Sequence, residues 1–455
     1  MKLISRRAGI LLLICLLFFV GMAVFIVSYI QDAPKWVASP LNQHVFVNGK
    51  LTNAGTITDI NGKVLAQSVG GTRSYNEDIA TRIAMMHLVG DNGGNVATSL
   101  QVAFRDKLVG WDFLNGVYRM GNDTGDNIKT TVDANVSRVA QEALNGRKGT
   151  VGVMNYKTGD LVCMVSSPSF DPSNPPDIAS NPGKYEGVYI NRLLSATYTP
   201  GSIFKLVTAS AAINEIPGID ERVFECSGKV TISGGDITCP RAHGKQSFTE
   251  TLVHSCNVAY AEMANEIGAP KMKQYAEKAG LNSTLKLNRI PVSTGTIDLR
   301  NADDLELAWT GVGQAETLIN PLSYLQFVAS IANDGKTVSP NVINKIKTAR
   351  GLPASIDVDI PRGNSMDAQT AQSLQNMMRA CVEGNYGEGG LRGFNMAAKT
   401  GTAETSDDTK PHSWYCGFLD NPVEPLAFIV LVENGGTGST AAYDVAVKVL
   451  QEAVK

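Results

Sequence analysis

The sequence has no excess of charge of either sign and no internal repeat. Its 40 lysines and arginines are matched by 43 aspartates and glutamates, which leaves a formal net charge of −3 over 455 residues. Without a basic surface field, nucleic acid is not an expected partner. The 43% hydrophobic content is enough for a sizeable core and for two or more domains.

Charge is also missing between Ala8 and Ile30, a stretch that is almost wholly apolar and long enough to cross a bilayer. Positive charges precede it at Lys2, Arg6 and Arg7. The positive-inside rule therefore predicts a cytoplasmic tail at 1–7, a single-pass anchor in the cell membrane at 8–30 and an extracytoplasmic remainder. The alternative is a cleaved signal peptide ending near Val37-Ala38-Ser39, but its apolar region would span only about 7–15 residues.

Residues 31–145 contain no catalytic spacing, and we interpret them as a small β-rich pedestal or dimerisation-like domain. Asn48-Gly49 and Asn61-Gly62 each lie between short apolar runs, a pattern typical of hairpin turns. The rest of the chain, 146–455, is predicted to form the second and larger domain.

Cysteines are few, and six of the seven lie outside the anchor. Cys226 and Cys239 flank two short predicted strands joined by a Gly-Gly turn, so we predict a disulfide that closes this hairpin. A zinc site of Cys226, Cys239 and His243 is the weaker alternative, because the sequence offers no evident fourth ligand. Cys163 and Cys416 lie in apolar runs and are predicted to be inert core residues.

The larger domain alternates strand-like and helix-like segments. Strands at both ends of this domain, with helices between and after them, predict an α/β (α+β) fold with a central antiparallel sheet packed by helices. Gly384 to Gly393 is glycine-rich and is predicted to be a mobile loop. The predicted strands are 150–154, 161–165, 396–402, 413–419 and 426–432, and the predicted helices include 251–266, 321–333, 367–382 and 442–454.

One short segment carries a candidate catalytic pair. Pro200-Gly201 interrupts the chain, and the apolar, alanine-rich run that follows predicts a buried helix with Ser202 in its first turn. Lys205 lies one turn on and shares a face with Ser202. A neutral lysine can deprotonate the serine, but it needs a pKa about three units below its free value of ~10.4, at a cost of about 4 kcal/mol. Desolvation and the positive end of the helix dipole both favour that shift, and free N–H groups there can hold an oxyanion.

Two further segments can complete such a site. Ser255-Cys256-Asn257 offers a hydroxyl to relay a proton and an amide to hold a substrate backbone, and Lys399-Thr400-Gly401-Thr402 offers an ammonium and hydroxyls for a carboxylate. Each motif also occurs elsewhere, but only these copies stand in the order Ser-x-x-Lys, Ser-x-Asn, Lys-Thr-Gly with domain-scale gaps. The other copies are Ser283 to Lys286, Ser74 to Asn76 and Lys157 to Gly159.

With this ordered trio, the chain resembles the class B penicillin-binding proteins, the monofunctional D,D-transpeptidases of bacterial cell-wall synthesis. The likeness runs from the anchor to the C-terminus and is densest after residue 146. Where the family's membrane-proximal motif usually has arginines, this chain has Ala54 and Ile60, and its N-terminal region is short for the class. We expect neither a second catalytic domain nor a C-terminal accessory module. Further similar stretches are 55–66, 164–172, 311–314 with 320–322, and 398–404.

The resemblance implies a mechanism and a set of partners. Ser202 attacks the penultimate D-Ala of a peptidoglycan stem peptide ending in D-Ala-D-Ala, Lys205 takes its proton, and the N–H groups of Ser202 and Thr402 form the oxyanion hole. β-Lactam antibiotics acylate the same serine, no metal or organic cofactor is needed, and a membrane glycan polymerase is an expected partner. The remaining implied roles are a proton path through Ser255 and Lys399, peptide binding by Asn257, and carboxylate binding by Thr400 and Thr402. Independently of the resemblance, a glycine at Gly401 lets another backbone approach closely.

Other functions share this chemistry or this serine. A β-lactam sensor would normally carry several membrane spans, and a scaffold without turnover would not need the intact trio. A D,D-carboxypeptidase or a β-lactamase differs from a transpeptidase in that water, rather than an amine, resolves the acyl-enzyme. The spacing of the motifs does not show which of the two acts here. His254 is interpreted as a helix-surface or packing residue rather than a base. Trp414 and Tyr415 are expected to pack beside the strand that carries Lys399, and the alternative is that one of them lines the cleft.

Overall fold

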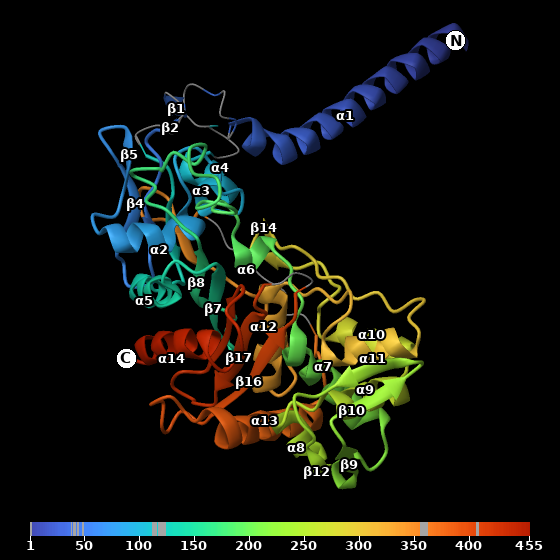
Figure 1. The fold of residues 1–455 in the computed structure, drawn as a ribbon. Helices are drawn as coiled ribbons and strands as arrows, with labels where there is room; N and C mark the ends of the chain where they lie inside the picture. Colours follow the sequence, from blue (N-terminus) through green and yellow to red (C-terminus); the bar gives the residue numbers. More distant parts are fainter. Residues whose placement is uncertain are drawn as a thin grey trace.

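The chain folds around two five-stranded sheets, with a group of helices beside the larger one (Figure 1). The description rests on a computed structural model, which describes residues 2–37, 39, 42, 45–47, 50–111, 116, 124–354, 363–405 and 409–455.

Helix α1 (Lys2–Val37) extends away from the rest of the molecule (Figure 1). Its Arg6–Ala33 portion is the one helix among the described residues that is long and apolar enough to cross a membrane, and its most apolar window is not buried by protein. An exposed apolar helix of this length suits a bilayer rather than water. The predicted anchor is therefore a single helix of membrane-spanning length.

The smaller sheet has the strand order β15-β6-β3-β4-β5, and only the β3–β6 pair is parallel. β3 and β4 pair around the predicted Asn61-Gly62 turn. The predicted turn at Asn48-Gly49 lies outside the described residues, between the paired strands β1 (Phe46–Val47) and β2 (Lys50–Leu51). The strands are β3 (Ile57–Thr58), β4 (Val64–Val69), β5 (Thr72–Tyr75), β6 (Asn127–Thr130) and β15 (Ile343–Lys347), with helices α2 (Ile79–Val89), α3 (Leu100–Ala103) and α4 (Arg105–Leu108).

Strand β15 joins this sheet from far along the chain. It pairs antiparallel with β6 through Ile343 to Thr130 and Lys347 to Asn127. The smaller sheet is therefore built from two segments that lie far apart in the sequence, and β15 falls outside a domain that ends at residue 145. A division into 31–145 and 146–455 stays a prediction.

The larger sheet has the strand order β16-β17-β18-β7-β8 and is antiparallel throughout. β18 is buried along its whole length, because Phe428 and Val430 belong to one hydrophobic cluster and Ile429 and Leu431 to another. Both faces of the sheet are thus covered, and the predicted antiparallel sheet packed by helices is confirmed. The strands are β7 (Gly149–Asn155), β8 (Leu161–Ser167), β16 (Met396–Ala403), β17 (His412–Leu419) and β18 (Leu426–Val432).

Helices α5 (Ala134–Leu144) and α14 (Ala441–Ala453) cover one face of this sheet, and α12 (Pro321–Ala332) covers the other. Asn320 begins α12 by accepting hydrogen bonds from the N–H groups of Leu322 and Ser323, with a proline in the first turn. The remaining elements include α6 (Arg192–Ser195), α7 (Lys205–Glu215), α10 (Ala269–Lys278), α11 (Asp304–Val312), α13 (Ala368–Cys381), β9 (Val223–Cys226), β10 (Lys229–Ile232), β11 (Gly235–Thr238), β12 (Gly244–Ser247), β13 (Lys286–Leu287) and β14 (Ile290–Pro291).

The predicted helix over 251–266 is helical from residue 257 onward, but the prediction of one continuous helix is wrong because the chain breaks near its start. α8 (Phe248–Val253) ends first, and α9 (Asn257–Ile267) begins after a turn. Ser255 adopts a left-handed backbone conformation, with φ of +54°, and the Cys256 sulfur accepts a hydrogen bond from the Ala259 N–H to cap α9. This local cap competes with a continuous helix. The break leaves Ser255 and Asn257 at a turn that faces α7.

Candidate active site

Ser202 lies on a short 3₁₀ turn, Gly201–Phe204, that leads directly into α7. Gly201 has a φ of +56°, and a Cβ placed on it would lie 2.3 Å from the Thr402 carbonyl oxygen. Only glycine permits both the conformation and this approach. The turn that carries Ser202 is therefore held against the backbone of β16.

Gly313 supports the same turn from the other side. It ends α11 with a φ of +88°, and its carbonyl oxygen accepts a hydrogen bond of 2.8 Å from the Gly201 N–H. A Cβ on Gly313 would lie 2.0 Å from the Gly201 carbonyl oxygen. The packing between α11 and the Ser202 turn thus requires glycine at both positions.

Substitution of Gly313 by alanine should destabilise the protein more than substitution of Gly234. Both glycines have a positive φ, but a Cβ on Gly234 meets nothing within 4 Å. Gly234→Ala should cost roughly 1–2 kcal/mol of backbone strain, and Gly313→Ala should add about 1–3 kcal/mol from the close contact. Denaturant unfolding of both variants measures the difference, and equal losses would contradict the proposed role of the contact.

Lys205 connects the three motifs. Its side chain is fully buried, and its Nζ lies 2.8 Å from Ser202 Oγ and 2.7 Å from Asn257 Oδ1. The Ser255 carbonyl oxygen is 3.0 Å away. Burial, together with the neighbouring Lys399 ammonium, lowers the pKa of Lys205 well below its ordinary value. A neutral Nζ can accept the Ser202 proton while it donates to the two other oxygens.

Ser255 lies between two lysines. Its Oγ is 3.3 Å from Lys205 Nζ and 3.1 Å from Lys399 Nζ. Lys399 is fully buried and also donates to the Thr400 carbonyl oxygen at 3.0 Å. A chain of proton donors and acceptors therefore runs from Ser202 through Lys205 and Ser255 to Lys399.

Three of the residues that were predicted to bind substrate, Asn257, Thr400 and Thr402, line a cavity of about 620 Å³ beside Ser202 and Ser255. The fourth, Gly401, does not line it. Thr400 and Thr402 face the cavity, whereas Lys399 and Gly401 face the protein on the other side of β16. A Cβ on Gly401 would lie 3.0 Å from the Pro200 carbonyl oxygen. The lining residues are Ser202, Thr238, Pro240, Arg241, His243, Val253, His254, Ser255, Asn257, Trp309, Val312, Gln314, Asn385, Tyr386, Thr400, Thr402, Glu404, Thr437 and Ser439.

Several of these lining residues were not identified as site residues from the sequence. Tyr386 ends a π-helical turn, Val382–Tyr386, at the start of the segment that was predicted to be a glycine-rich loop. Its hydroxyl lies 2.8 Å from Thr400 Oγ1. Trp309 and Arg241 reach the cavity from segments without a motif, and only their place in the fold reveals them. Gln314 belongs to a stretch that the family resemblance had marked.

Trp414 and Tyr415 lie away from the cavity, whereas His254 lies at it. Trp414 and Tyr415 are buried on β17 opposite β16, and Trp414 Nε1 donates to the Thr199 carbonyl oxygen at 3.0 Å. Neither lines the cavity. His254 does line it, with Nδ1 3.1 Å from Gln246 Oε1.

The predicted disulfide between Cys226 and Cys239 is not formed in the structure. Their sulfur atoms lie 3.8 Å apart, and Cys256 Sγ lies 3.9 Å from Cys239 Sγ. The hairpin of β10 and β11 does form, but its ends lead into a cluster of three thiols and His243. Cys256 is the fourth ligand that was missing when the zinc alternative was judged weaker from the sequence.

The other copies of the motifs lie elsewhere. Lys286 is exposed on β13, Ser74 on β5 bonds to the Gln67 carbonyl oxygen, and Lys157 Nζ bonds to Asn333 Oδ1. None of them lines the cavity.

Comparison with known proteins agrees with this geometry. Residues 149–454 match a family model described as the penicillin binding protein transpeptidase domain. The chain is 27% identical over 467 residues to peptidoglycan D,D-transpeptidase PbpA of Mycolicibacterium smegmatis, covering 95% of this chain and 94% of that protein. It is 28% identical over 360 residues to PbpA of Mycobacterium tuberculosis, covering 73% of each.

Solved structures give the same result. The penicillin G acyl-enzyme complex of penicillin-binding protein A from M. tuberculosis superposes with a TM-score of 0.78 at 26% identity, covering 89% of this chain and all of that one. Its ceftriaxone acyl-enzyme complex gives a TM-score of 0.79 over 88% of this chain and 98% of the other.

Proposed function

Because the chain belongs to the penicillin-binding protein transpeptidase family, as a class B member, we propose that it is a peptidoglycan D,D-transpeptidase whose acyl-enzyme forms on Ser202. The observation that carries the assignment of Ser202 is the buried Lys205, whose Nζ lies within hydrogen-bond distance of Ser202, Ser255 and Asn257. β-Lactams acylate penicillin-binding protein A of M. tuberculosis. The same proposal therefore includes covalent inhibition of this protein by β-lactams.

Acylation begins with a proton transfer from Ser202 to Lys205. The Ser202 oxygen attacks the carbonyl carbon of the penultimate D-Ala, and Lys205 Nζ accepts the hydroxyl proton. The N–H groups of Ser202 and Thr402 are the proposed oxyanion donors. The approach of Thr402 to Gly201, which leaves no room for a Cβ on that glycine, supports this pairing.

Collapse of the tetrahedral intermediate breaks the bond to the terminal D-Ala. Its amine needs a proton, which passes from the protonated Lys205 through Ser255, whose Oγ is 3.3 Å from Lys205 Nζ. Lys399, 3.1 Å from the same oxygen, orients this hydroxyl. In the second half-reaction an amine from a neighbouring stem attacks the acyl-enzyme, loses its proton along the reverse path and releases Ser202 as a hydroxyl.

The terminal carboxylate of the substrate is assigned to Thr400 and Thr402. Both face the cavity, Lys399 Nζ bonds to the Thr400 carbonyl oxygen, and Arg241 is among the other lining residues. β16 is an edge strand, so its free side can pair with an extended peptide. The Asn257 Nδ2 group donates 2.7 Å to the Thr238 carbonyl oxygen, which orients the amide at the proposed peptide-binding position.

The membrane arrangement follows from α1 and its flanking charge. Lys2, Arg6 and Arg7 precede the apolar stretch, which supports a cytoplasmic N-terminus and an extracytoplasmic catalytic domain. A single span would hold the enzyme at the membrane where lipid-linked wall precursors arrive. A membrane glycan polymerase that supplies nascent strands is the partner that this placement favours.

Transfer to an amine distinguishes this function from its alternatives. The full chain in detergent should form a stable adduct with a fluorescent penicillin, and it should exchange the terminal D-Ala of a stem peptide for a labelled D-amino acid, read by mass spectrometry. Loss of D-Ala without exchange indicates a carboxypeptidase, and rapid loss of the penicillin adduct indicates a β-lactamase. A stable adduct without turnover of the peptide indicates a sensor or a scaffold.

A further inference from the structure

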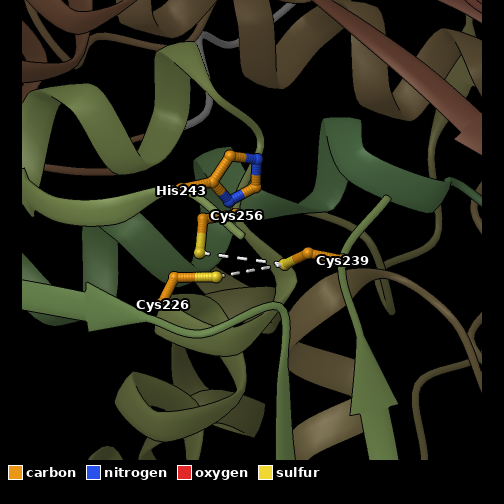
Figure 2. A group of neighbouring side chains, drawn as sticks. All are labelled: Cys226, Cys239, His243 and Cys256. Carbon is orange, nitrogen blue, oxygen red and sulfur yellow. Dashed lines mark hydrogen bonds between the residues drawn. The ribbon is translucent and has the colours of Figure 1, made fainter. Parts of the chain in front are cut away.

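Three cysteines and one histidine converge beside the active site (Figure 2). Cys226 ends β9, Cys239 follows β11, His243 precedes β12 and Cys256 precedes α9. Four separate segments therefore bring their side chains to one point. The catalytic steps proposed above use none of the four.

The distances within this cluster match tetrahedral metal coordination. Cys239 Sγ lies 3.8 Å from Cys226 Sγ and 3.9 Å from Cys256 Sγ, and all four ligand atoms lie within 4.8 Å of one another. Zinc–sulfur bonds of about 2.3 Å in a tetrahedron place two sulfurs about 3.8 Å apart. A disulfide needs a separation of about 2.05 Å and joins only two of the three thiols.

His243 completes the set of donors. Its Nδ1 is buried and has no hydrogen-bond partner among the described residues, and Figure 2 shows a ring nitrogen on the side of the thiols. The ring stacks on His254, with centroids 5.4 Å apart and planes 9° apart, which fixes its orientation. An unpartnered, buried ring nitrogen is costly unless it binds a proton donor or a metal.

Backbone groups are placed to stabilise thiolates in this cluster. The Asn257 N–H lies 3.2 Å from Cys239 Sγ, and the Ala259 N–H lies 3.5 Å from Cys256 Sγ. Both donors belong to the first turn of α9, where the helix dipole also favours negative charge. Hydrogen bonds of this kind are the outer shell that orients metal ligands.

We propose that Cys226, Cys239, His243 and Cys256 bind one Zn²⁺ ion. Three thiols lose their protons to solvent and His243 binds as the neutral imidazole, so the occupied site carries a net charge of −1. Soft sulfur ligands and a tetrahedral arrangement select zinc over magnesium or calcium. All four positions are filled by protein, which makes this a structural site rather than a catalytic one.

The zinc ion positions the active site through Cys256. This ligand stands between Ser255 and Asn257, at the turn where Ser255 is left-handed. Its coordination holds the turn against β9 and the β11–β12 connection. Removal of the ion should therefore slow acylation of Ser202 without changing the nucleophile.

The metal content of the full chain, purified in detergent without chelator, tests the site. Mass spectrometry of the metal should find about one zinc per chain, and Cys239→Ser and His243→Ala should lose it. His243→Cys keeps four ligands and should retain the zinc, and Cys163→Ala removes a thiol far from the cluster and should also retain it. A wild-type chain that binds no zinc even when zinc is added, or one that contains a Cys239–Cys256 or Cys226–Cys239 disulfide, overturns the proposal.

Cobalt substitution gives a readout that is independent of activity. Co²⁺ in the wild type and in His243→Cys should give thiolate-to-cobalt charge-transfer absorption, and Cys239→Ser should lower it. Stripping the metal should lower the midpoint of thermal unfolding and slow penicillin acylation, and added Zn²⁺ should restore both. If stripping changes neither, the site does not position the Ser255 turn.

Discussion

Ser202→Ala abolishes labelling by a fluorescent penicillin and lowers D-Ala exchange by a factor of about 10⁴ or more. The variant retains Lys205, the cavity and the proposed oxyanion donors, but it has no atom that can form the acyl bond. The Ser202 side chain is partly exposed in the cavity, so its loss creates no cavity in the core. The unfolding midpoint should therefore remain close to that of the wild type. Gel fluorescence measures the penicillin labelling, and mass spectrometry measures the D-Ala exchange.

Ser283→Ala is the matched control for this result. It removes the serine of the second Ser-x-x-Lys sequence, whose Lys286 is exposed on β13. It should label at the wild-type rate. If Ser202→Ala is still labelled, and peptide mapping identifies the labelled residue, that residue is the nucleophile and the assignment of Ser202 is wrong.

Lys205→Arg lowers the second-order rate of acylation by roughly 10²–10⁴-fold at neutral pH. An arginine cannot accept the Ser202 proton because it stays protonated, and it places a permanent positive charge where the base must be neutral. Methionine at the same position removes the base without adding a charge, and should show a loss of similar size. A stopped-flow or gel time course of penicillin labelling measures the rate. Lys286→Arg, in the second copy of the motif, serves as the control and should leave the rate unchanged.

The pH dependence has a defined sign. Burial and Lys399 lower the pKa of Lys205, so the fraction of neutral Lys205 and the acylation rate rise as pH increases through that lowered pKa. The unfolded chain binds more protons at this position between the lowered pKa and the ordinary value of ~10.4, so the contribution of Lys205 to stability also rises with pH in that window. The Lys205→Arg rate should stay low and nearly flat between about pH 5 and 9. A wild-type rate that falls as pH rises would contradict the role of Lys205 as base.

Elements with a strong local pattern could be predicted from the sequence. β7, β8, β16, β17 and β18 are short strand-like runs, and their predicted ranges agree with the structure within two residues. α12, α13 and α14 were also predicted. α12 is an apolar segment that is buried at every position, whereas α13 and α14 are each buried on one face.

Elements that depend on a single local conformation could not be predicted. The hydrophobic pattern from 251 to 266 is helical, and nothing in it signals that Ser255 turns left-handed and that Cys256 caps a new helix. The π-helical turn before Tyr386 is likewise hidden in a segment rich in glycine. In both places a few side-chain contacts outweigh the periodicity of the segment.

The candidate site could be predicted from the sequence only through the order of its three motifs. Ser202 and Lys205 are close because they share one turn, but the approach of Ser255 and Lys399 to each other joins residues more than a hundred positions apart. Order and spacing along the chain indicated the trio, but not the geometry. The cysteine cluster shows the same limit, since Cys256 looked like part of a helix until the fold placed it beside Cys239.

Strand β15 delays completion of the smaller sheet until late in protein synthesis. β6 is complete once residue 130 has been made, but its partner on one side, Ile343–Lys347, is synthesised more than two hundred residues later. Until then β6 is an open edge that can pair with another chain. The smaller sheet therefore cannot be completed before residue 347 has been made, and a truncation after residue 145 would leave that edge exposed permanently.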